Sequence, residues 1–266
     1  MIPARLFDTH CHLFEHGFYG RTGILLTGTG EELFAYERYR AEFGIERAFV
    51  VAYEESTRYR GNSAYLDGLA ATREWLVPLG FAAVGDPLPA RRAVSAYVST
   101  PGEGRWLADA LAAAVDPPAV VSLNARPDAL HELVPSIRAL EGTWFLVSHL
   151  GLPGPSPSRD AAELGLSSLL ALAGSPNVSV KLSGQYAASL VGYPHPDVQH
   201  LVDLVADRFG LGALTWGSDF SPCLEHVTLQ EAVECVLPTG LGPSESEAIY
   251  FGNAERLFTH YLGASA

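Results

Sequence analysis

Asp8-Thr9-His10-Cys11-His12 is the stretch from which we interpret the rest of the chain, because two histidines two residues apart follow the apolar pair Leu6-Phe7. Residues i and i+2 of a β-strand project from the same face. Their Cα atoms lie about 6.6 Å apart, so both imidazoles can reach one point. Because zinc binds imidazole nitrogens, the stretch predicts half of a metal site, with Cys11 on the opposite face. The alternative is a pair of hydrogen-bonded core histidines.

Strand and helix patterns alternate along the whole chain, and eight apolar runs are predicted as strands. These runs are residues 5–12, 47–53, 77–84, 92–99, 119–124, 144–149, 178–183 and 213–218. Helical periodicity lies between and after them, over residues 31–43, 66–75, 105–115, 127–140, about 159–173, 200–209, 229–236, 244–250 and 254–261. Continuous apolar strands are typical of a parallel sheet that is covered on its faces.

Eight strand–helix units in 266 residues predict an α/β fold, a (β/α)₈ TIM-like barrel that forms a single domain over residues 1–266. A doubly wound open sheet is the alternative, with the histidines at its switch point. The glycine-rich segment Gly17–Gly30 interrupts the first unit and is long enough to act as a flap.

Composition excludes several classes of function. The net charge of −13 argues against nucleic acid and anionic membranes as partners, because both attract basic surfaces. Three widely spaced cysteines form no disulfide framework. With no secretory signal or apolar run long enough to span a membrane, we expect a cytoplasmic protein that acts on a small molecule. A homo-oligomer remains compatible with the sequence.

Polar side chains gather at the predicted carboxyl ends of the strands, where TIM barrels carry their chemistry. His10 and His12 end the first strand, His149 ends the sixth on the face of Phe145 and Val147, and Asp219 follows the eighth. Three imidazole nitrogens and one carboxylate oxygen predict a divalent metal site, with zinc preferred and manganese as the alternative. Taken singly, His149 also fits a core or helix-cap histidine and Asp219 a structural cap.

Five sequence blocks, taken together, resemble the amidohydrolase-related family. They are the opening Asp8–His12 stretch, Ser148-His149-Leu150-Gly151, Val180-Lys181-Leu182-Ser183-Gly184, Gly217-Ser218-Asp219 and Gly252-Asn253-Ala254-Glu255-Arg256-Leu257-Phe258. The branch in question contains sugar lactonases, pyrone dicarboxylate lactonases and nonoxidative decarboxylases. The resemblance implies a TIM-like barrel with His10, His12, His149 and Asp219 in its active site.

The same resemblance bears on the metal and the substrate. The chain's one lysine, Lys181, lies on the seventh predicted strand, so the carboxylated lysine that bridges two metals in some members has no counterpart on the fourth. Some lactonases of this branch work without metal, which makes a metal-free enzyme a further alternative. In the segment Asn124-Ala125-Arg126-Pro127, the arginine resembles one that lies near an acidic or sugar substrate.

The first functional hypothesis is a hydrolase that opens a lactone of a sugar acid or small carboxylic acid. Asp219 and His149 are its predicted catalytic residues, since an aspartate at a metal's edge can take a proton from water. A metal-dependent nonoxidative decarboxylase is the second hypothesis, and a barrel that binds a small acid without catalysis is the third. The predicted substrate-binding residues are Arg126, Asn124, Lys181 and Tyr186; for Lys181 a pairing with Asp8 is equally favoured. The chain contains no Gly-x-Ser-x-Gly motif, which argues against a serine hydrolase.

Overall fold

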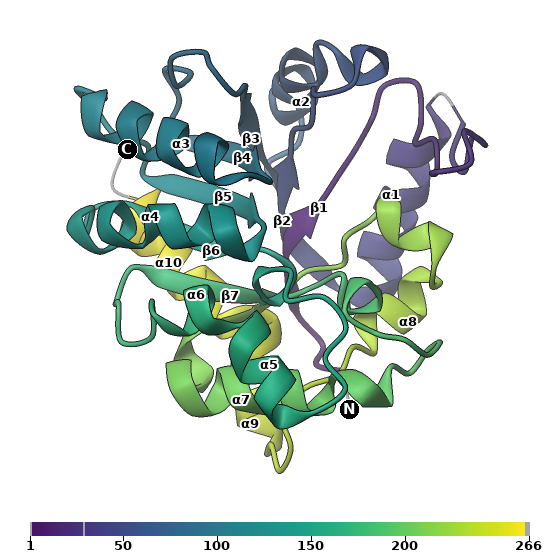
Figure 1. Ribbon diagram of the computed structural model, residues 1–266. Coiled ribbons are helices and arrows are strands. Elements are labelled where there is room, and N and C mark those ends of the chain that lie inside the picture. The colour runs from purple at the N-terminus through teal and green to yellow at the C-terminus, as the bar shows by residue number, and fades with distance from the viewer. Residues whose placement is uncertain (1, 29, 264–266) are drawn as a thin grey trace.

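A computed structural model describes residues 2–28 and 30–263 of the chain, and its centre is a sheet of eight parallel strands (Figure 1). The strands follow one another around the sheet in sequence order, and helices surround them. The predicted TIM-like barrel is therefore confirmed, and the open doubly wound sheet is excluded. Met1, Thr29 and residues 264–266 of the predicted domain lie outside the described residues.

The strands agree with the predicted runs to within a few residues at each end. They are β1 (Leu6–Cys11), β2 (Ile45–Val51), β3 (Leu76–Ala82), β4 (Ala93–Val98), β5 (Val120–Ala125), β6 (Trp144–Val147), β7 (Val178–Leu182) and β8 (Leu214–Trp216).

The α-helices are α1 (Glu31–Phe43), α2 (Asn62–Ala70), α3 (Pro101–Ala113), α4 (Pro127–Ala139), α5 (Arg159–Gly165), α6 (Ser167–Leu170), α7 (Gln199–Phe209), α8 (Leu229–Val233), α9 (Pro243–Glu247) and α10 (Asn253–Tyr261). Shorter helical turns include η2 (His149–Gly151), η3 (Gln185–Ala187), η6 (Pro222–Glu225) and the π-helical turn η7 (Ala248–Gly252).

Three helices differ clearly from the prediction. Helix α3 starts at Pro101, four residues before the predicted helix 105–115, because Thr100 and Glu103 form a capping box at its N-terminus. Helix α2 starts four residues before the predicted helix 66–75, because Gly61 takes a left-handed conformation (φ 85°) that a glycine adopts readily and that begins the helix there. The predicted helix 159–173 is two short helices, α5 and α6, that meet at Leu166.

The barrel is closed by the segment that follows β8. Seven neighbouring strand pairs form the continuous part of the sheet. Between β1 and β8, the Thr9 hydroxyl donates to the carbonyl of Trp216 at 2.6 Å, and Asp219 N–H donates to the carbonyl of His10 at 2.7 Å. Closure therefore brings Asp219 beside the histidine strand.

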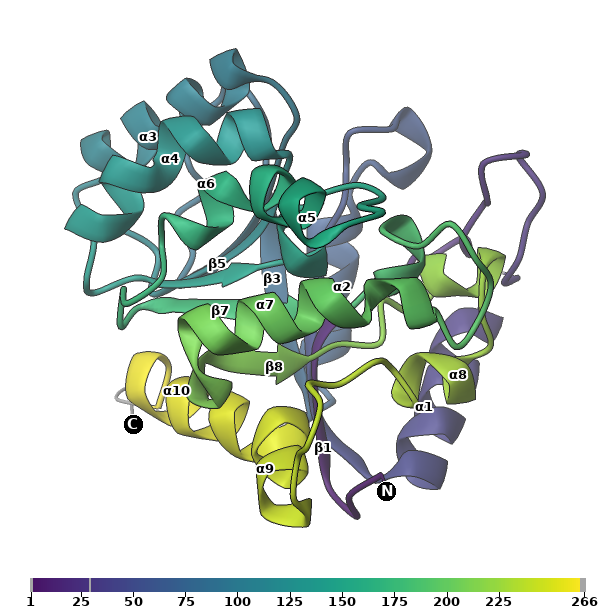
Figure 2. The ribbon, with the colours of Figure 1, turned by 60° about the horizontal axis from the view of Figure 1, so that its bottom comes forward.

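Apolar side chains fill the barrel and the layer outside it. Phe7, Phe49 and Trp144 lie in an interior cluster that also contains Ala254 and Leu257 of α10. Figure 2 shows α9 and α10 near the end of the molecule at which β1 begins. Because helices cover that end of the barrel, the carboxyl ends of the strands are the open face.

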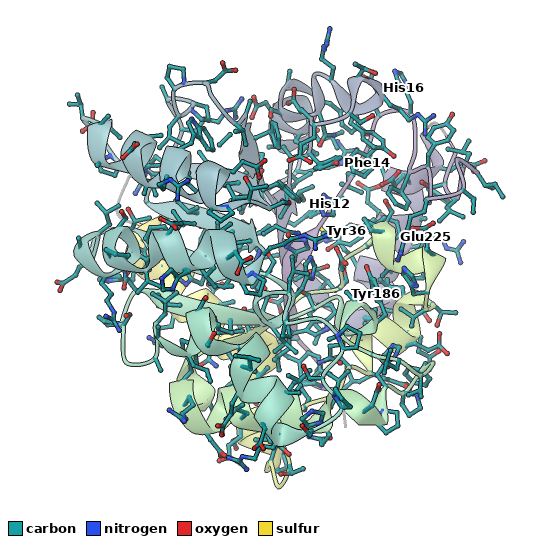
Figure 3. The ribbon with its side chains drawn as sticks, in the orientation of Figure 1. His12, Phe14, His16, Tyr36, Tyr186 and Glu225 are labelled. Carbon is teal, nitrogen blue, oxygen red and sulfur yellow. The ribbon has the colours of Figure 1, made fainter. Side chains whose placement is uncertain are left out.

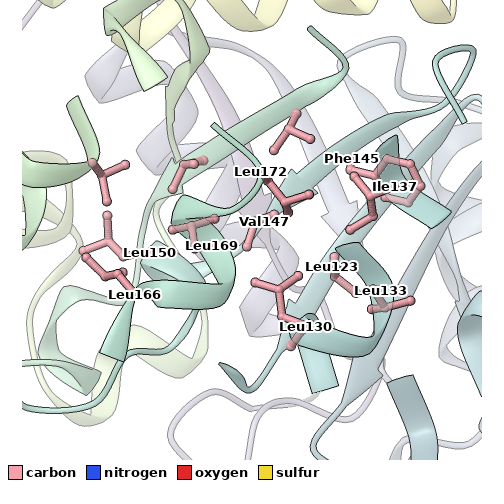
Figure 4. Packing of buried hydrophobic residues seen from close by; sticks show 14 of the residues in the cluster. Leu123, Leu130, Leu133, Ile137, Phe145, Val147, Leu150, Leu166, Leu169 and Leu172 are labelled. Carbon is pink, nitrogen blue, oxygen red and sulfur yellow. The ribbon is translucent and has the colours of Figure 1, made fainter. Parts of the chain in front are cut away.

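Outside the strands, an aliphatic cluster joins β4–β7 to helices α3, α4, α6 and α7. Leu123, Leu133, Phe145 and Leu169 belong to it, and all are buried (Figure 4). A second outer cluster packs Cys11 with Tyr36 of α1 and Leu66 of α2. In the described part of the chain, no helix is long and apolar enough to cross a membrane.

Candidate active site

The strand that leads to the two histidines contains a bulge between Asp8 and Cys11. Asp8 pairs with Ala48 and Cys11 pairs with Val50, so three steps along β1 match two along β2. Such a bulge re-aims the side chains that follow it. Phe7 and Cys11 would share a face in a regular strand, yet Phe7 lies in the interior cluster and Cys11 in the outer one. His10 lies within the bulge and His12 just after the strand, and their Nε2 atoms are 3.3 Å apart.

Asp219 completes a compact group of donor atoms with these two histidines. Its Oδ1 atom lies 3.4 Å from His10 Nε2 and 3.8 Å from His12 Nε2, and all three side chains are buried. One ligand atom from each residue lies within 4.8 Å of the others. Gly217 makes this approach possible, because a Cβ at that position would lie 2.8 Å from His10 Cβ. Two imidazole nitrogens and a carboxylate oxygen that converge in this way fit a divalent cation such as zinc.

His149 reaches the site by a different route from the one that strand alternation predicts. β6 ends at Val147, and both Phe145 and Val147 face the outer aliphatic cluster, so the prediction that His149 shares their face is wrong. His149 and Leu150 instead take left-handed conformations, with φ of 54° and 56°. This turn redirects the His149 ring to 4.7 Å from the His10 ring, measured between centroids.

His149 lies beside the three-donor cluster rather than inside it. Its Nδ1 atom is 3.0 Å from Ser183 Oγ and 4.0 Å from Asp219 Oδ2. Gly184 leaves room for the ring, because a Cβ there would lie 2.4 Å from His149 Nδ1. The predicted fourth ligand is thus within reach of the carboxylate, while the closest donor set is His10, His12 and Asp219.

Lys181 is fully buried behind His10. Its Nζ atom donates to Ser122 Oγ at 2.6 Å and lies 3.0 Å from His10 Nδ1. The predicted pairing with Asp8 is wrong, because the Asp8 carboxylate accepts hydrogen bonds from Tyr36 and Ser218 instead. Burial lowers the pKa of Lys181 to about 7, although Asp8 and Asp219 oppose the shift. Lys181 therefore contacts the Nδ1 atom of His10, while the Nε2 atom of the same ring faces Asp219.

The protonation states of the cluster suit a cation. Burial lowers the pKa of His10 and His149, and it lowers the pKa of His12 to about 4, so the three imidazoles are neutral near pH 7. Burial alone would raise the pKa of Asp219, but interactions with His149 and His10 hold it below its usual range. Metal binding requires neutral imidazole and ionised carboxylate, which are the forms that this environment favours.

The predicted substrate-binding residues fall in different places. Tyr186, on the turn after β7, donates a hydrogen bond from its hydroxyl to Asp219 Oδ2. Asn124 is partly exposed at the end of β5, and Arg126 is exposed where α4 begins. The structure therefore unites Tyr186 with the cluster and leaves Arg126 on the rim.

An aromatic wall beside the cluster was not predicted as a unit. Phe14 stacks on His12 with ring centroids 5.7 Å apart, and Tyr59 stacks on Phe14 at 4.2 Å. Tyr53 and Tyr97 continue the wall, 5.0 Å apart. The signal for Tyr97 was available, since an aromatic residue near the carboxyl end of a barrel strand lies close to the chemistry.

Asp8 also helps to build the site, although the sequence indicated only a pairing with Lys181 for it. Its buried carboxylate accepts from the backbone N–H of Ser218 at 2.9 Å and of His10 at 3.1 Å, besides the Tyr36 hydroxyl at 2.8 Å. Burial raises its pKa to about 6 in spite of these hydrogen bonds. Asp8 thereby ties the histidine strand to the segment that carries Asp219.

Comparison with known structures supports the fold at low identity. A crystal structure of an amidohydrolase from Burkholderia multivorans with bound zinc has a TM-score of 0.73 and 19% identity, over 96% of this chain and 99% of that chain. A probable 2-pyrone-4,6-dicarboxylic acid hydrolase from Acinetobacter baumannii, crystallised with citric acid, has a TM-score of 0.69 and 17% identity over the same shares. For 5-carboxyvanillate decarboxylase from Sphingomonas paucimobilis the values are 0.58 and 11%, again over 96% and 99%.

The search of curated proteins found no match to this sequence. A family model described as amidohydrolase matches residues 110–259, which is more than half of the chain. That match covers β5 to α10 and so includes His149, Lys181 and Asp219. On this evidence the chain belongs to the amidohydrolase family.

Proposed function

We propose that this protein is a hydrolase that opens a lactone of a small carboxylic acid or sugar acid, with zinc as the preferred cofactor. The observation that carries the proposal is the buried cluster of His10, His12 and Asp219, whose donor atoms lie within 4.8 Å of one another. The cluster occupies the carboxyl ends of the barrel strands, where enzymes of this fold carry out their chemistry. Membership of the amidohydrolase family supports hydrolysis.

His10 Nε2, His12 Nε2 and one oxygen of Asp219 would hold the metal, with manganese as the alternative ion. A bound divalent ion polarises a carbonyl and lowers the pKa of water. Asp219 takes the proton of the attacking water as the water oxygen bonds to the lactone carbonyl carbon. When the ring C–O bond breaks, Asp219 returns that proton to the leaving oxygen. A metal-free enzyme would depend on this carboxylate alone.

His149 is suited to a second catalytic role. Its ring is neutral, oriented by Ser183 and packed beside His10. A neutral imidazole that carries one N–H can donate to the carbonyl oxygen of the substrate as negative charge develops there. We therefore assign His149 to carbonyl polarisation and Asp219 to proton transfer.

The proposed substrate class rests on two polar residues at the open face of the barrel. Asn124 lies near the end of β5 and Arg126 directly follows the strand at the open face, where a guanidinium can bind a carboxylate through two parallel hydrogen bonds. The Acinetobacter baumannii structure, titled as a probable hydrolase of a pyrone dicarboxylic acid, is consistent with a small acid as the substrate. We place the enzyme in the cytoplasm and expect neither nucleic acid nor a membrane as its partner. A homo-oligomer is compatible with this proposal.

The proposal is tested with a panel of sugar-acid, pyrone and aliphatic lactones, together with metal analysis of the purified protein. His12→Ala and Asp219→Asn should each abolish turnover, because each removes a converging group, while the melting temperature stays nearly unchanged. Matched controls are His16→Ala and Asp128→Asn, whose side chains are exposed and which should keep wild-type activity.

Three results would contradict the proposal. Wild-type turnover in either site variant would remove the assigned roles. Release of carbon dioxide from aromatic acids, without lactone hydrolysis, would identify the decarboxylase instead. Tight binding of a small acid with no turnover across both panels would identify a non-catalytic barrel.

A further inference from the structure

The segment between β1 and α1 is a folded flap, which we define as residues 14–28. Its two arms pair through a bridge between Tyr19 and Leu25, and Gly20 N–H donates to the carbonyl of Ile24 at 2.9 Å. Gly17 has φ of 79°, and a Cβ there would lie 1.8 Å from the carbonyl oxygen of Thr27. The flap therefore has a defined shape that its glycines make possible.

The tip of the flap is fastened to the segment that follows β8. Arg21 N–H donates to Glu225 Oε1 at 2.5 Å, and the Arg21 guanidinium donates to His226 Nε2 at 2.6 Å. Gly20 permits the approach, because a Cβ on it would lie 2.3 Å from Glu225 Oε1. These contacts join two segments that are about 200 residues apart in sequence.

From His226 the contacts continue to the catalytic carboxylate. The His226 ring stacks on Tyr186 with centroids 4.2 Å apart and an interplanar angle of 17°. The Tyr186 hydroxyl donates to Asp219 Oδ2, while Asp219 Oδ1 faces His10 and His12. Figure 3 labels His12, Tyr186 and Glu225 in the same part of the molecule.

We propose that the docked flap positions the Asp219 carboxylate, through Arg21, His226 and Tyr186 in turn. Arg21 and His226 are then positioning residues, since neither touches the reacting atoms. The Arg21 side chain is 75% exposed, so this end of the chain of contacts lies at the surface, where a substrate that enters can displace or complete it. The inference rests on the proposed role of Asp219 in proton transfer.

The restraint matters because the carboxylate of an aspartate can rotate about its Cβ–Cγ bond. Either oxygen of Asp219 could face the histidines, and intermediate orientations would place neither oxygen well. A hydrogen bond from a tyrosine whose ring is itself held by stacking selects one orientation. Because catalysis depends steeply on the alignment of reacting groups, loss of this restraint lowers kcat more than it changes KM.

A double-mutant cycle tests the inference, with Arg21→Ala, Tyr186→Phe and the combined variant. Tyr186→Phe keeps the ring on His226 and removes the hydroxyl that reaches Asp219. The matched control is Arg58→Ala, because the Arg58 guanidinium stacks on Tyr19 of the flap at 4.0 Å and so contacts the flap outside the series Arg21, His226 and Tyr186. Thermal melts confirm that each variant folds.

The first readout is independent of turnover and of metal. In chelator-treated protein, ring ¹⁵N signals of the histidines are measured by NMR. Arg21→Ala should shift the signals of His10 and His12, which face Asp219, as well as that of His226. In the Tyr186→Phe background the same substitution should shift only His226. Arg58→Ala should leave the His10 and His12 signals unchanged.

The second readout is kinetic. Arg21→Ala should lower kcat by about threefold to thirtyfold, the range expected when a contact that couples two sites is lost. It should have no further effect once Tyr186 is phenylalanine. Unmoved His10 and His12 signals in Arg21→Ala, or equal shifts in both backgrounds, would overturn the inference even if lactones are hydrolysed. An absence of lactone hydrolysis with the expected signal shifts would overturn the proposed function alone.

Discussion

Two regions of the barrel are buried to the same degree but are held together by different forces. Where β1 meets β8, the interior is polar: Asp8, Thr9, His10, Ser218 and Asp219 are each at most 4% exposed. We call these residues the polar junction. On the opposite side, β4–β7 pack against α3, α4, α6 and α7 through leucine, valine and alanine. We call this the aliphatic side.

The difference indicates which buried positions tolerate substitution. Apolar contacts are non-directional, so the aliphatic side needs side chains of suitable volume rather than particular partners. A buried polar group must find its own hydrogen-bond partner, and its loss leaves the partner unsatisfied. Removal of a buried acceptor that joins the two segments of the polar junction, such as Asp8, should therefore affect both stability and activity, whereas changes on the aliphatic side should affect stability alone.

The largest combined effect is expected from Asp8→Ala at the polar junction. The change leaves the N–H groups of Ser218 and His10 and the hydroxyl of Tyr36 without their acceptor, which should cost about 3 kcal/mol or more in free energy of unfolding. Turnover should also fall, because Asp8 ties the histidine strand to the Asp219 segment. Urea unfolding and kcat measure the two effects. Asp109→Ala, an exposed aspartate of α3, is the control, and an active, stable Asp8 variant would remove the distinction between the regions.

On the aliphatic side, Leu133→Ala should destabilise the protein and leave the chemistry intact. Leu133 is fully buried on α4, and truncation of a buried leucine costs about 2–5 kcal/mol. At a temperature where the variant stays folded, kcat and metal content should equal those of the wild type. Leu164→Ala, at a leucine that is 78% exposed, is the matched control and should change little. A loss of kcat in folded Leu133→Ala would show that the two regions are coupled.

A smaller, pH-dependent effect is expected at Glu32, which lies between the flap and the segment after β8. Its carboxylate accepts from Thr27 Oγ1 at 2.7 Å and from Ser221 Oγ at 2.5 Å, and burial raises its pKa to about 7 from 4.5. The folded state then holds a proton that the unfolded state releases. Its contribution to stability is complete below pH 4.5 and is lost as the pH rises through 7.

Glu32→Gln should remove this dependence, which is at most about 1.4 kcal/mol per pH unit between pH 4.5 and 7. Urea unfolding at four pH values across the window measures it. Glu31→Gln, the exposed neighbour on the same helix, should keep the slope of the wild type. An identical slope in Glu32→Gln would show that the Glu32 carboxyl does not carry the effect.

The cluster of His10, His12 and Asp219 was visible in the sequence, but the way in which it is assembled was not. The His-x-His spacing and the late aspartate predicted three groups that the structure brings together. Strand alternation failed at His149, because β6 ends two residues earlier and a left-handed turn redirects the ring. It also gave no sign of the β1 bulge, since a register shift depends on the partner strand and not on the local sequence.

The sequence by itself determined the fold class, the order of the strands and the donor types at the open face. It could do so because periodicity, turn residues and donor chemistry are local properties of the chain. Only the tertiary structure decided that Lys181 lies behind His10, that Asp8 joins β1 to the segment after β8, and that the flap reaches Asp219 through Tyr186. These contacts join residues far apart in sequence, and closure of the barrel alone brings them together.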